Sequence, residues 1–286
     1  MIQDIFPYKL NNQFVQNVVP SDNDKVMIFS QGKVLAHLES GSVIFPTVQE
    51  LENSCASKHQ LVYLFSISNQ DGTKESYFLY EQTNIQIPNF EFTDLRQIRD
   101  TEMDFMYKVM AMMTAKHLSD WYRDTKFCGR CGCKTVHSKT ERAMICSDEN
   151  CGYTMYPRIM PAVIVGVING DKLLLTKYRN GYANNALVAG FTEIGETLEE
   201  TVAREVMEEA GLKVKNIRYY KSQPWGLAND ILAGFYCDVD GDTTIKMDEN
   251  ELKEAAFVQR QDIILQPTKV SLTNEMMLRF KNGDPC

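Results

Sequence analysis

Several features that would define a class of protein are missing from this sequence. No run approaches the roughly 20 apolar residues needed to span a bilayer, and the N-terminus, MIQDIFPYKL, has neither a basic lead nor a continuous apolar stretch. We therefore expect a cytoplasmic protein. An excess of basic charge is also absent: 30 Lys and Arg face 38 Asp and Glu, for a net charge of -8. This balance disfavours a surface built for nucleic acid and favours small-molecule substrates, with a local basic groove left open.

A cysteine framework spread over the whole fold is missing as well. Five of the eight cysteines fall within one short segment, Cys128 to Cys151, which indicates a metal site rather than a set of disulfides. There is no long-period repeat and no low-complexity tract. The 286 residues are 44% hydrophobic and 24% charged, so two or three compact globular units are expected.

The chain divides by pattern into four parts. Residues 1–95 contain β-like runs at Lys25–Phe29, Lys33–His37, Gln60–Ser68 and Glu75–Glu81, and predict a mostly β domain with a structural or dimerising role. Residues 96–123 predict a connecting helix over Asp100–Asp120, in which a methionine stripe at helical spacing fills a core: Met103, Met106, Met110 and Met113, with Tyr107 and Leu118. The cysteine segment occupies residues 124–156.

Residues 157–286 alternate strands and helices. Strands are expected at Pro161–Ile168, Lys172–Lys177, Ile217–Lys221, Ile231–Asp238 and Ala255–Val258, and helices at Thr197–Ala210 and Asn274–Lys281. Asn169-Gly170 is a two-residue hairpin signal between the first two strands. The pattern predicts an α+β domain in which a sheet lies between helices.

Three carboxylates converge on the helix at Thr197–Ala210. Thr197 and Glu200 form a capping-box pattern and Gly211 a C-terminal stop. At 3.6 residues per turn, Glu205, Glu208 and Glu209 fall within an arc of roughly 100° beside the apolar stripe. Like charges this close destabilise a helix unless a cation lies among them, and Mg2+ or Mn2+ with a bridged diphosphate would suit the site. An ordinary solvated acidic face is the alternative.

The carboxylates are part of a longer motif. GFTEIGETLEETVAREVMEEAGL, from Gly190 to Leu212, matches G-x5-E-x7-R-E-U-x-E-E-x-G-U at every position, where U is aliphatic. The segment thus resembles the signature of the Nudix hydrolases, which implies an α/β/α sandwich and metal-dependent pyrophosphate cleavage. The resemblance also implies that Arg204 pairs with Glu196 and orders the loop rather than reacting. The catalytic candidates are Glu205, Glu208, Glu209, Glu196 and Arg204.

The cysteine segment predicts structural zinc. Cys128 and Cys131 form a tight pair, and Cys146 and Cys151 follow after fourteen intervening residues. Two thiolate pairs with this separation suit tetrahedral Zn2+ with every position filled by protein. Cys133 offers a competing sulfur, and a redox dithiol is the other reading. Zinc ribbons also bind nucleic acid, but Arg130, Lys134, Lys139 and Arg142 lie among acidic residues and give only a modest basic surface.

A second motif bears on the identity of the substrate. Ser222-Gln223-Pro224-Trp225 follows the signature by ten residues. Together with the ribbon and the signature it resembles the NADH pyrophosphatase (NAD diphosphatase) family, from about Phe127 to Phe257. The family motif continues as PFPxS, whereas this chain reads Gly226-Leu227-Ala228-Asn229-Asp230, which weakens the case for strict dinucleotide selection.

That resemblance implies hydrolysis of NADH or NAD+ to nicotinamide mononucleotide and AMP, removal of NAD caps from RNA, and a homodimer. It implies that a base is held between aromatic side chains, which are physically suited to stacking. The substrate-binding candidates are Phe191, Tyr156, Ser222, Gln223, Trp225 and Ala189. Among Asp248, Glu249, Glu251 and Glu254, Glu251 best matches the family's additional metal-binding Glu.

Two further functions stay open. One is a broader hydrolase of ADP-ribose or other nucleoside diphosphate derivatives. The other belongs to a different class, a non-catalytic Nudix-fold nucleotide sensor or RNA-binding module, although such modules usually lose carboxylates that this chain retains.

Overall fold

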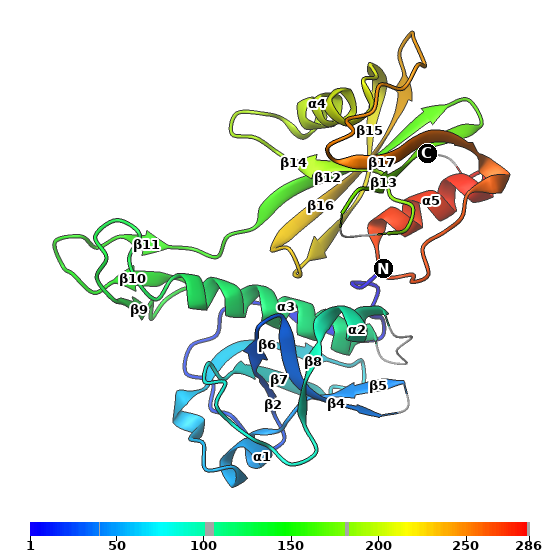
Figure 1. The fold of residues 1–286 in the computed structure, drawn as a ribbon. Coiled ribbons are helices and arrows are strands. Elements are labelled where there is room, and N and C mark those ends of the chain that lie inside the picture. Colours follow the sequence, from blue (N-terminus) through cyan, green and yellow to red (C-terminus); the bar gives the residue numbers. More distant parts are fainter. Residues whose placement is uncertain (40, 101–105, 181–182, 285–286) are drawn as a thin grey trace. The chain divides into compact units, whose positions relative to one another are not determined.

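The structure, a computed structural model, describes residues 1–39, 41–100, 106–180 and 183–284. The chain forms two compact units (Figure 1). The first contains residues 2–158 and 226–229, and the second contains residues 159–225 and 230–286 together with Met1. The division into four domains stays a prediction.

The N-terminal part of the first unit is built from short strands. One sheet has the order β1-β6-β7-β2, from Lys9–Asn11, Val62–Ser68, Lys74–Leu79 and Lys25–Met27. In the other, β4 pairs with β3, β5 and β8, from Lys33–Glu39, Phe29–Ser30, Ser42–Ile44 and Glu91–Asp94. Helix α1 (Val48–Asn53) and the 3-10 turn η1 (Lys58–Gln60) follow β5. The expected mostly β architecture is confirmed.

Two helices lead from these sheets to the cysteine segment. They are α2 (Leu95–Asp100) and α3 (Met106–Asp124), with Met103 outside the described residues. The stripe members Met110 and Met113 are 6% and 1% exposed, so their expected role as core filler is confirmed. The ribbon that follows is a three-stranded sheet of order β11-β10-β9, from Thr154–Met155, Met144–Cys146 and Thr135–His137.

The second unit is a mixed sheet with a helix on each face (Figure 1). Its strands run in the order β15-β16-β12-β13-β17, from Val214–Trp225, Asp230–Val239, Met160–Asn169, Lys172–Tyr178 and Leu252–Gln259; β14 (Val188–Phe191) also pairs with β12. Only β12 and β16 are parallel among these pairs. The 3-10 turn η2 (Arg260–Asp262) follows β17.

Alternation along the strands produces the two faces, because successive side chains of a strand point in opposite directions. Val163, Val165 and Val167 of β12 pack with α4 (Leu198–Ala210). Ile164, the residue between the first two, packs with α5 (Leu272–Asn282). The expected sheet between helices is confirmed.

Two local expectations are corrected. The β12–β13 hairpin closes on the pair Asn169 and Lys172, so its loop is Gly170-Asp171 and not Asn169-Gly170. Gly170 takes φ +60° at the first central position, which glycine adopts without strain. Strand β15 extends beyond the predicted Ile217–Lys221 to Trp225, which pairs with Asp230. Within the described residues, no helix is both long and apolar enough to cross a bilayer.

Candidate active site

Helix α4 begins and ends as its sequence predicts. The Thr197 hydroxyl accepts a hydrogen bond from the Glu200 N–H at 3.2 Å, and the Glu200 carboxylate accepts one from the Thr197 N–H at 2.8 Å. This reciprocal capping box satisfies two backbone donors at the start of the helix. Gly211 closes the helix in the left-handed conformation at φ +68°. The carboxylates are thus carried on a helix with fixed ends.

Strand β14 brings backbone close to one of these carboxylates. Gly190 pairs with Val163 of β12, and a Cβ placed on it would lie 2.0 Å from the carboxyl carbon of Glu205. Any side chain at this position would have to displace that carboxyl group. The glycine of the signature therefore leaves the space that the Glu205 carboxylate occupies.

Arg204 joins the loop between β14 and α4, here called the box loop, to the helix. Its guanidinium donates to Glu196 at 2.6 and 2.9 Å, to Glu205 at 2.7 Å, to Glu208 at 3.0 Å and to the Phe191 carbonyl at 2.9 Å. Hydrogen bonds from Arg204, followed by one from the Glu193 N–H, lower the pKa of Glu196 to about 2. The arginine thus holds both the carbonyl of the loop and the carboxylates of the helix.

Glu209 is the buried member of the carboxylate group. It is 2% exposed; its Oε1 accepts a hydrogen bond from the Ala189 N–H at 3.3 Å, while its Oε2 has no partner among the described residues. Burial raises its pKa to about 8, and the charges of Glu205, Glu251 and Asp248 add to the effect. Burial is also the main cause of the raised pKa of Glu205, against the opposing effect of Arg204.

This environment fits a divalent cation. A buried carboxylate with an unpartnered oxygen, next to other acids, is costly alone and is stabilised by a hard cation that takes oxygen ligands. Among the described residues, however, no three acids of the signature have ligand atoms that all lie within 4.8 Å of one another. Arg204 Nη1 binds the carboxylates of both Glu205 and Glu208 instead.

Two residues near the acids have no counterpart in the sequence prediction. The backbone N–H of Arg179 donates to the Glu251 carbonyl at 2.8 Å, and its Nε to the Glu249 carbonyl at 2.7 Å, which fixes the segment carrying Glu251. Burial raises the pKa of Tyr178, with further contributions from Glu209, Glu251 and Glu205. Both residues are brought to the site by the pairing of β13 with β17, a long-range contact that no local sequence motif predicts.

The substrate-binding candidates have different environments. Phe191, at the end of β14, is 50% exposed, and Ser222 and Trp225 lie on β15. Gln223 is buried: its amide donates to the Val270 carbonyl at 2.9 Å and accepts from the Leu272 N–H at 2.8 Å, so it anchors the start of α5. Its contact with substrate stays a prediction that these bonds do not support. Tyr156 belongs to the first unit, is 56% exposed and donates to Glu141 at 3.1 Å.

The four predicted zinc ligands come together in the ribbon. The Sγ atoms of Cys128, Cys131, Cys146 and Cys151 all lie within 4.8 Å of one another. Burial raises the pKa of Cys128, but hydrogen bonds from the N–H groups of Arg130 and Cys131 outweigh it and lower the value to about 7. This donor set fits a structural zinc ion. Cys133 belongs to a second group, with Cys131 and Asp148.

Comparisons with known families agree with this geometry. Residues 158–280 match the NUDIX domain, and residues 123–156 match the NADH pyrophosphatase zinc ribbon domain. A relative from Citrobacter koseri named "NAD-capped RNA hydrolase NudC" is 45% identical over 153 residues, covering 52% of this chain and 58% of the relative. One of the same name from Shigella flexneri is 47% identical over 154 residues, with the same coverage. The chain thus matches somewhat over half the length of these relatives.

Comparison with solved structures gives a partial match. The crystal structure of a NUDIX hydrolase from Nitrosomonas europaea is 24% identical, covers 56% of this chain and 95% of its own, and has a TM-score of 0.47. The two family matches, with the SQPW motif and the complete signature, confirm the resemblance seen in the sequence. Residues 123–280 are thus similar to the zinc ribbon of the NADH pyrophosphatases followed by a NUDIX domain.

Proposed function

We propose that this protein hydrolyses the pyrophosphate bond of NADH or NAD+ to nicotinamide mononucleotide and AMP, and removes the NAD cap from RNA. The observation that carries the proposal is the Glu209 carboxylate, buried with one oxygen unpartnered in the helix of a matched Nudix domain. Such a group is unfavourable unless the site serves a cation. The relatives' name, NAD-capped RNA hydrolase, supports the choice of substrate.

The residues of the site have separate proposed roles in metal binding, loop positioning and base stacking. Glu205, Glu208, Glu209 and Glu251 would hold Mg2+ or Mn2+. When bound, the cation would neutralise charge on the diphosphate oxygens and favour attack by water. Arg204 binds both Glu196 and the Phe191 carbonyl and so holds the loop before α4, from which the Phe191 ring would stack on a base. Trp225 and Tyr156 are the other stacking candidates, and Ala189 binds the Glu209 carboxylate through its N–H.

Assembly and location complete the proposal. We also propose a homodimer, which the resemblance implies, and a cytoplasmic location. The size of the assembly can be measured by light scattering at the concentrations used for the activity assay.

A broader substrate range is the second proposal, and one observation favours it. The family motif after Trp225 is replaced by Gly226-Leu227-Ala228-Asn229-Asp230. If that segment selects the nicotinamide half, its loss would admit ADP-ribose and related nucleoside diphosphates.

Comparing substrates separates the two proposals. NADH, NAD+, ADP-ribose and a dinucleoside polyphosphate are each assayed with Mn2+. We expect the highest kcat/KM for NADH or NAD+, whereas equal values for ADP-ribose and NADH would remove the assignment of dinucleotide preference. NAD-capped RNA, assayed beside free NAD+, shows whether the cap is accepted on a polynucleotide.

A pair of variants tests catalysis itself. Glu208 and Glu199 are both exposed acids of α4, but only Glu208 belongs to the carboxylate group bound by Arg204. We expect Glu208→Gln to abolish metal-dependent hydrolysis with the fold intact, and Glu199→Gln to remain active. Full activity of Glu208→Gln would refute its role as metal ligand, and no hydrolysis by the wild type would favour a nucleotide sensor.

A further inference from the structure

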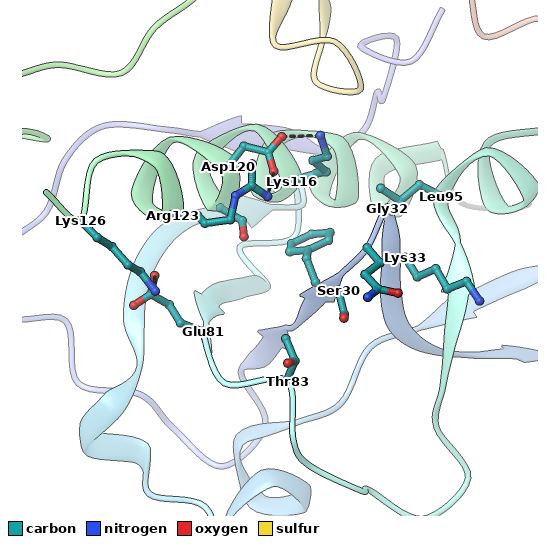
Figure 2. Close-up of a pocket in the computed structure, with 13 residues that line it drawn as sticks. Ser30, Gly32, Lys33, Glu81, Thr83, Leu95, Lys116, Asp120, Arg123 and Lys126 are labelled. Atoms are coloured by element: carbon teal, nitrogen blue, oxygen red, sulfur yellow. Dashed lines mark hydrogen bonds and ion pairs between the residues drawn. The ribbon is translucent and has the colours of Figure 1, made fainter. Parts of the chain in front are cut away.

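A cavity lies in the N-terminal part of the first unit (Figure 2). It has a volume of about 270 Å3 and is enclosed by the turn between β3 and β4, the segment after β7 and one side of α3. All of its lining residues fall between Phe29 and Lys126, so none belongs to the Nudix signature. The cavity therefore shares no residue with the proposed catalytic site.

The charge of the cavity is opposite to that of the chain. Four cationic side chains and two acidic ones line it: Lys33, Lys116, Arg123 and Lys126 against Glu81 and Asp120. The whole chain has a net charge of -8. A local excess of positive charge in an acidic protein indicates a site for an anion.

Asp120 holds two of the cations in place. The Lys116 ammonium binds its Oδ2, and Arg123 Nη1 binds its Oδ1 at 2.8 Å. Asp120 is 6% exposed and also accepts a hydrogen bond from the Asn229 amide at 3.2 Å. Figure 2 shows both cations beside Asp120 on the helix. One buried carboxylate thus positions two cations and neutralises only one of them.

The other two cations are less strongly engaged. Lys126 contacts Glu81 at 3.2 Å, with side chains 48% and 36% exposed, and pairs this exposed are weak. Lys33 makes no ion pair with the described part of the chain. Both can therefore turn to an incoming anion without breaking a strong contact.

The neutral lining suggests what else the ligand carries. Ser30, Thr83 and Ser119 offer hydroxyl groups, and Phe29 offers the face or edge of a ring. The volume lies just below the range of about 300–1,000 Å3 that is typical for drug-sized ligands, and it is too small for a dinucleotide. Cations, hydroxyls and one aromatic ring together match a phosphate joined to a small ring-bearing group.

We propose that this cavity binds a nucleoside monophosphate. The phosphate lies among Lys116, Arg123, Lys126 and Lys33, and the base or sugar lies against Phe29. The proposed hydrolysis releases molecules of this class, but binding in the cavity does not depend on that reaction. The N-terminal part of the chain would then bind a ligand in addition to its expected structural role.

Calorimetric titration of the full chain tests the proposal. AMP, adenosine and inorganic phosphate are titrated separately, in buffer without added Mg2+ or Mn2+. We expect AMP to bind more tightly than inorganic phosphate, and adenosine to bind weakly. No binding of AMP at concentrations up to about 10 mM would overturn the proposal.

Variants locate the binding. Lys33 and Arg123 are both exposed, so replacing them does not disturb a core. Lys33→Gln combined with Arg123→Gln should weaken AMP binding at least tenfold, because charge-assisted hydrogen bonds to phosphate are lost. Arg96→Gln, an exposed arginine of α2 outside the cavity, is the control and should leave the affinity unchanged.

A third variant tests the aromatic part. Phe29→Leu keeps an apolar side chain but removes the ring, so it should weaken AMP binding and leave inorganic phosphate unaffected. Equal affinities of the wild type for AMP and phosphate would overturn the nucleoside assignment. An unchanged AMP affinity in the double variant would place the binding elsewhere and overturn the site.

Discussion

At the scale of single residues, water reaches the three acids of α4 to different degrees. The side chain of Glu208 is 58% exposed, that of Glu205 is 12% exposed, and Glu209 is 2% exposed as a residue. Helical periodicity predicts that all three share an arc, and that much follows from spacing alone. Their depth does not follow from spacing, because it depends on the approach of Ala189 and Gly190 in a strand that pairs with β12.

The depth of Glu209 predicts a pH dependence of stability. Its pKa in the folded chain is raised to about 8 from 4.5. Its stabilising contribution is thus present below about pH 4.5 and is lost as pH rises through about 8. Since one pKa unit corresponds to about 1.4 kcal/mol, the loss is on the order of a few kcal/mol. Without added divalent cation, wild type should therefore lose more stability between these pH values than Glu209→Gln.

Urea denaturation at several pH values measures this difference. Any effect of pH on the cysteine segment is common to both proteins and cancels in the comparison. Adding Mn2+ at pH 8 should raise the urea midpoint of the wild type and change that of Glu209→Gln much less. Parallel pH profiles for the two proteins would contradict the burial of a costly charge at this position.

At the scale of elements, local signals predict the ends of α4 better than the strands around it. Thr197, Glu200 and Gly211 act within a few residues of one another, so the sequence contains the whole cause of the capping. Strand β14 has only four residues, and its pairing with β12 is a long-range contact that alternation cannot reveal. The hairpin loop lies one residue later than the predicted Asn169-Gly170, because Asn169 pairs with Lys172 and Gly170 takes the first position of the turn.

The contact between β14 and α4 predicts the effect of one methyl group. Gly190→Ala should displace the Glu205 carboxyl group, which lies 2.0 Å from the new Cβ position, with little effect on a backbone that is not in the left-handed region. Misplacing a group at a reacting centre by about 1 Å can cost on the order of 100-fold in rate. We expect a fall of this order in kcat/KM for NADH and a higher Mn2+ concentration for half-maximal activity.

A matched glycine controls for the substitution itself. Gly129 also lies outside the left-handed region and has no atom within 4 Å of a Cβ position, so Gly129→Ala should keep wild-type activity and melting temperature. Activity of Gly190→Ala equal to that of the wild type would show that the Glu205 carboxylate tolerates another position.

The ribbon predicts which thiols hold zinc. Cys151 belongs to the group of four sulfur atoms, whereas Cys133 groups with Cys131 and Asp148. We expect the wild type to contain one zinc ion per chain, because four thiolates complete a tetrahedral site. Cys151→Ser should lose zinc and lower the melting temperature, and Cys133→Ser should keep both. Atomic absorption measures the content, and loss of zinc from Cys133→Ser would show that its sulfur is the ligand.

At the scale of the whole molecule, charge limits how an RNA substrate can be held. The net charge is -8, and at least two of the five Lys and Arg residues in the ribbon, residues 124–156, are engaged within the chain. Arg142 donates to the carbonyls of Leu64 and Asn12, at 2.6 and 3.2 Å, and Arg130 lies 4.3 Å from the ring centre of Tyr153. Few cations of the ribbon are therefore free to neutralise RNA phosphates.

Salt dependence measures the number of phosphates contacted. For single strands the logarithm of affinity falls with that of salt concentration with a slope of about -0.7 per neutralised phosphate. With about two contacts beyond the cap, kcat/KM for NAD-capped RNA should fall less than about tenfold between about 50 and 200 mM salt. Free NAD+, measured in parallel, corrects for salt effects at the catalytic site. A fall of about 1,000-fold would instead require about seven or more contacts and a basic surface provided by an assembly of chains.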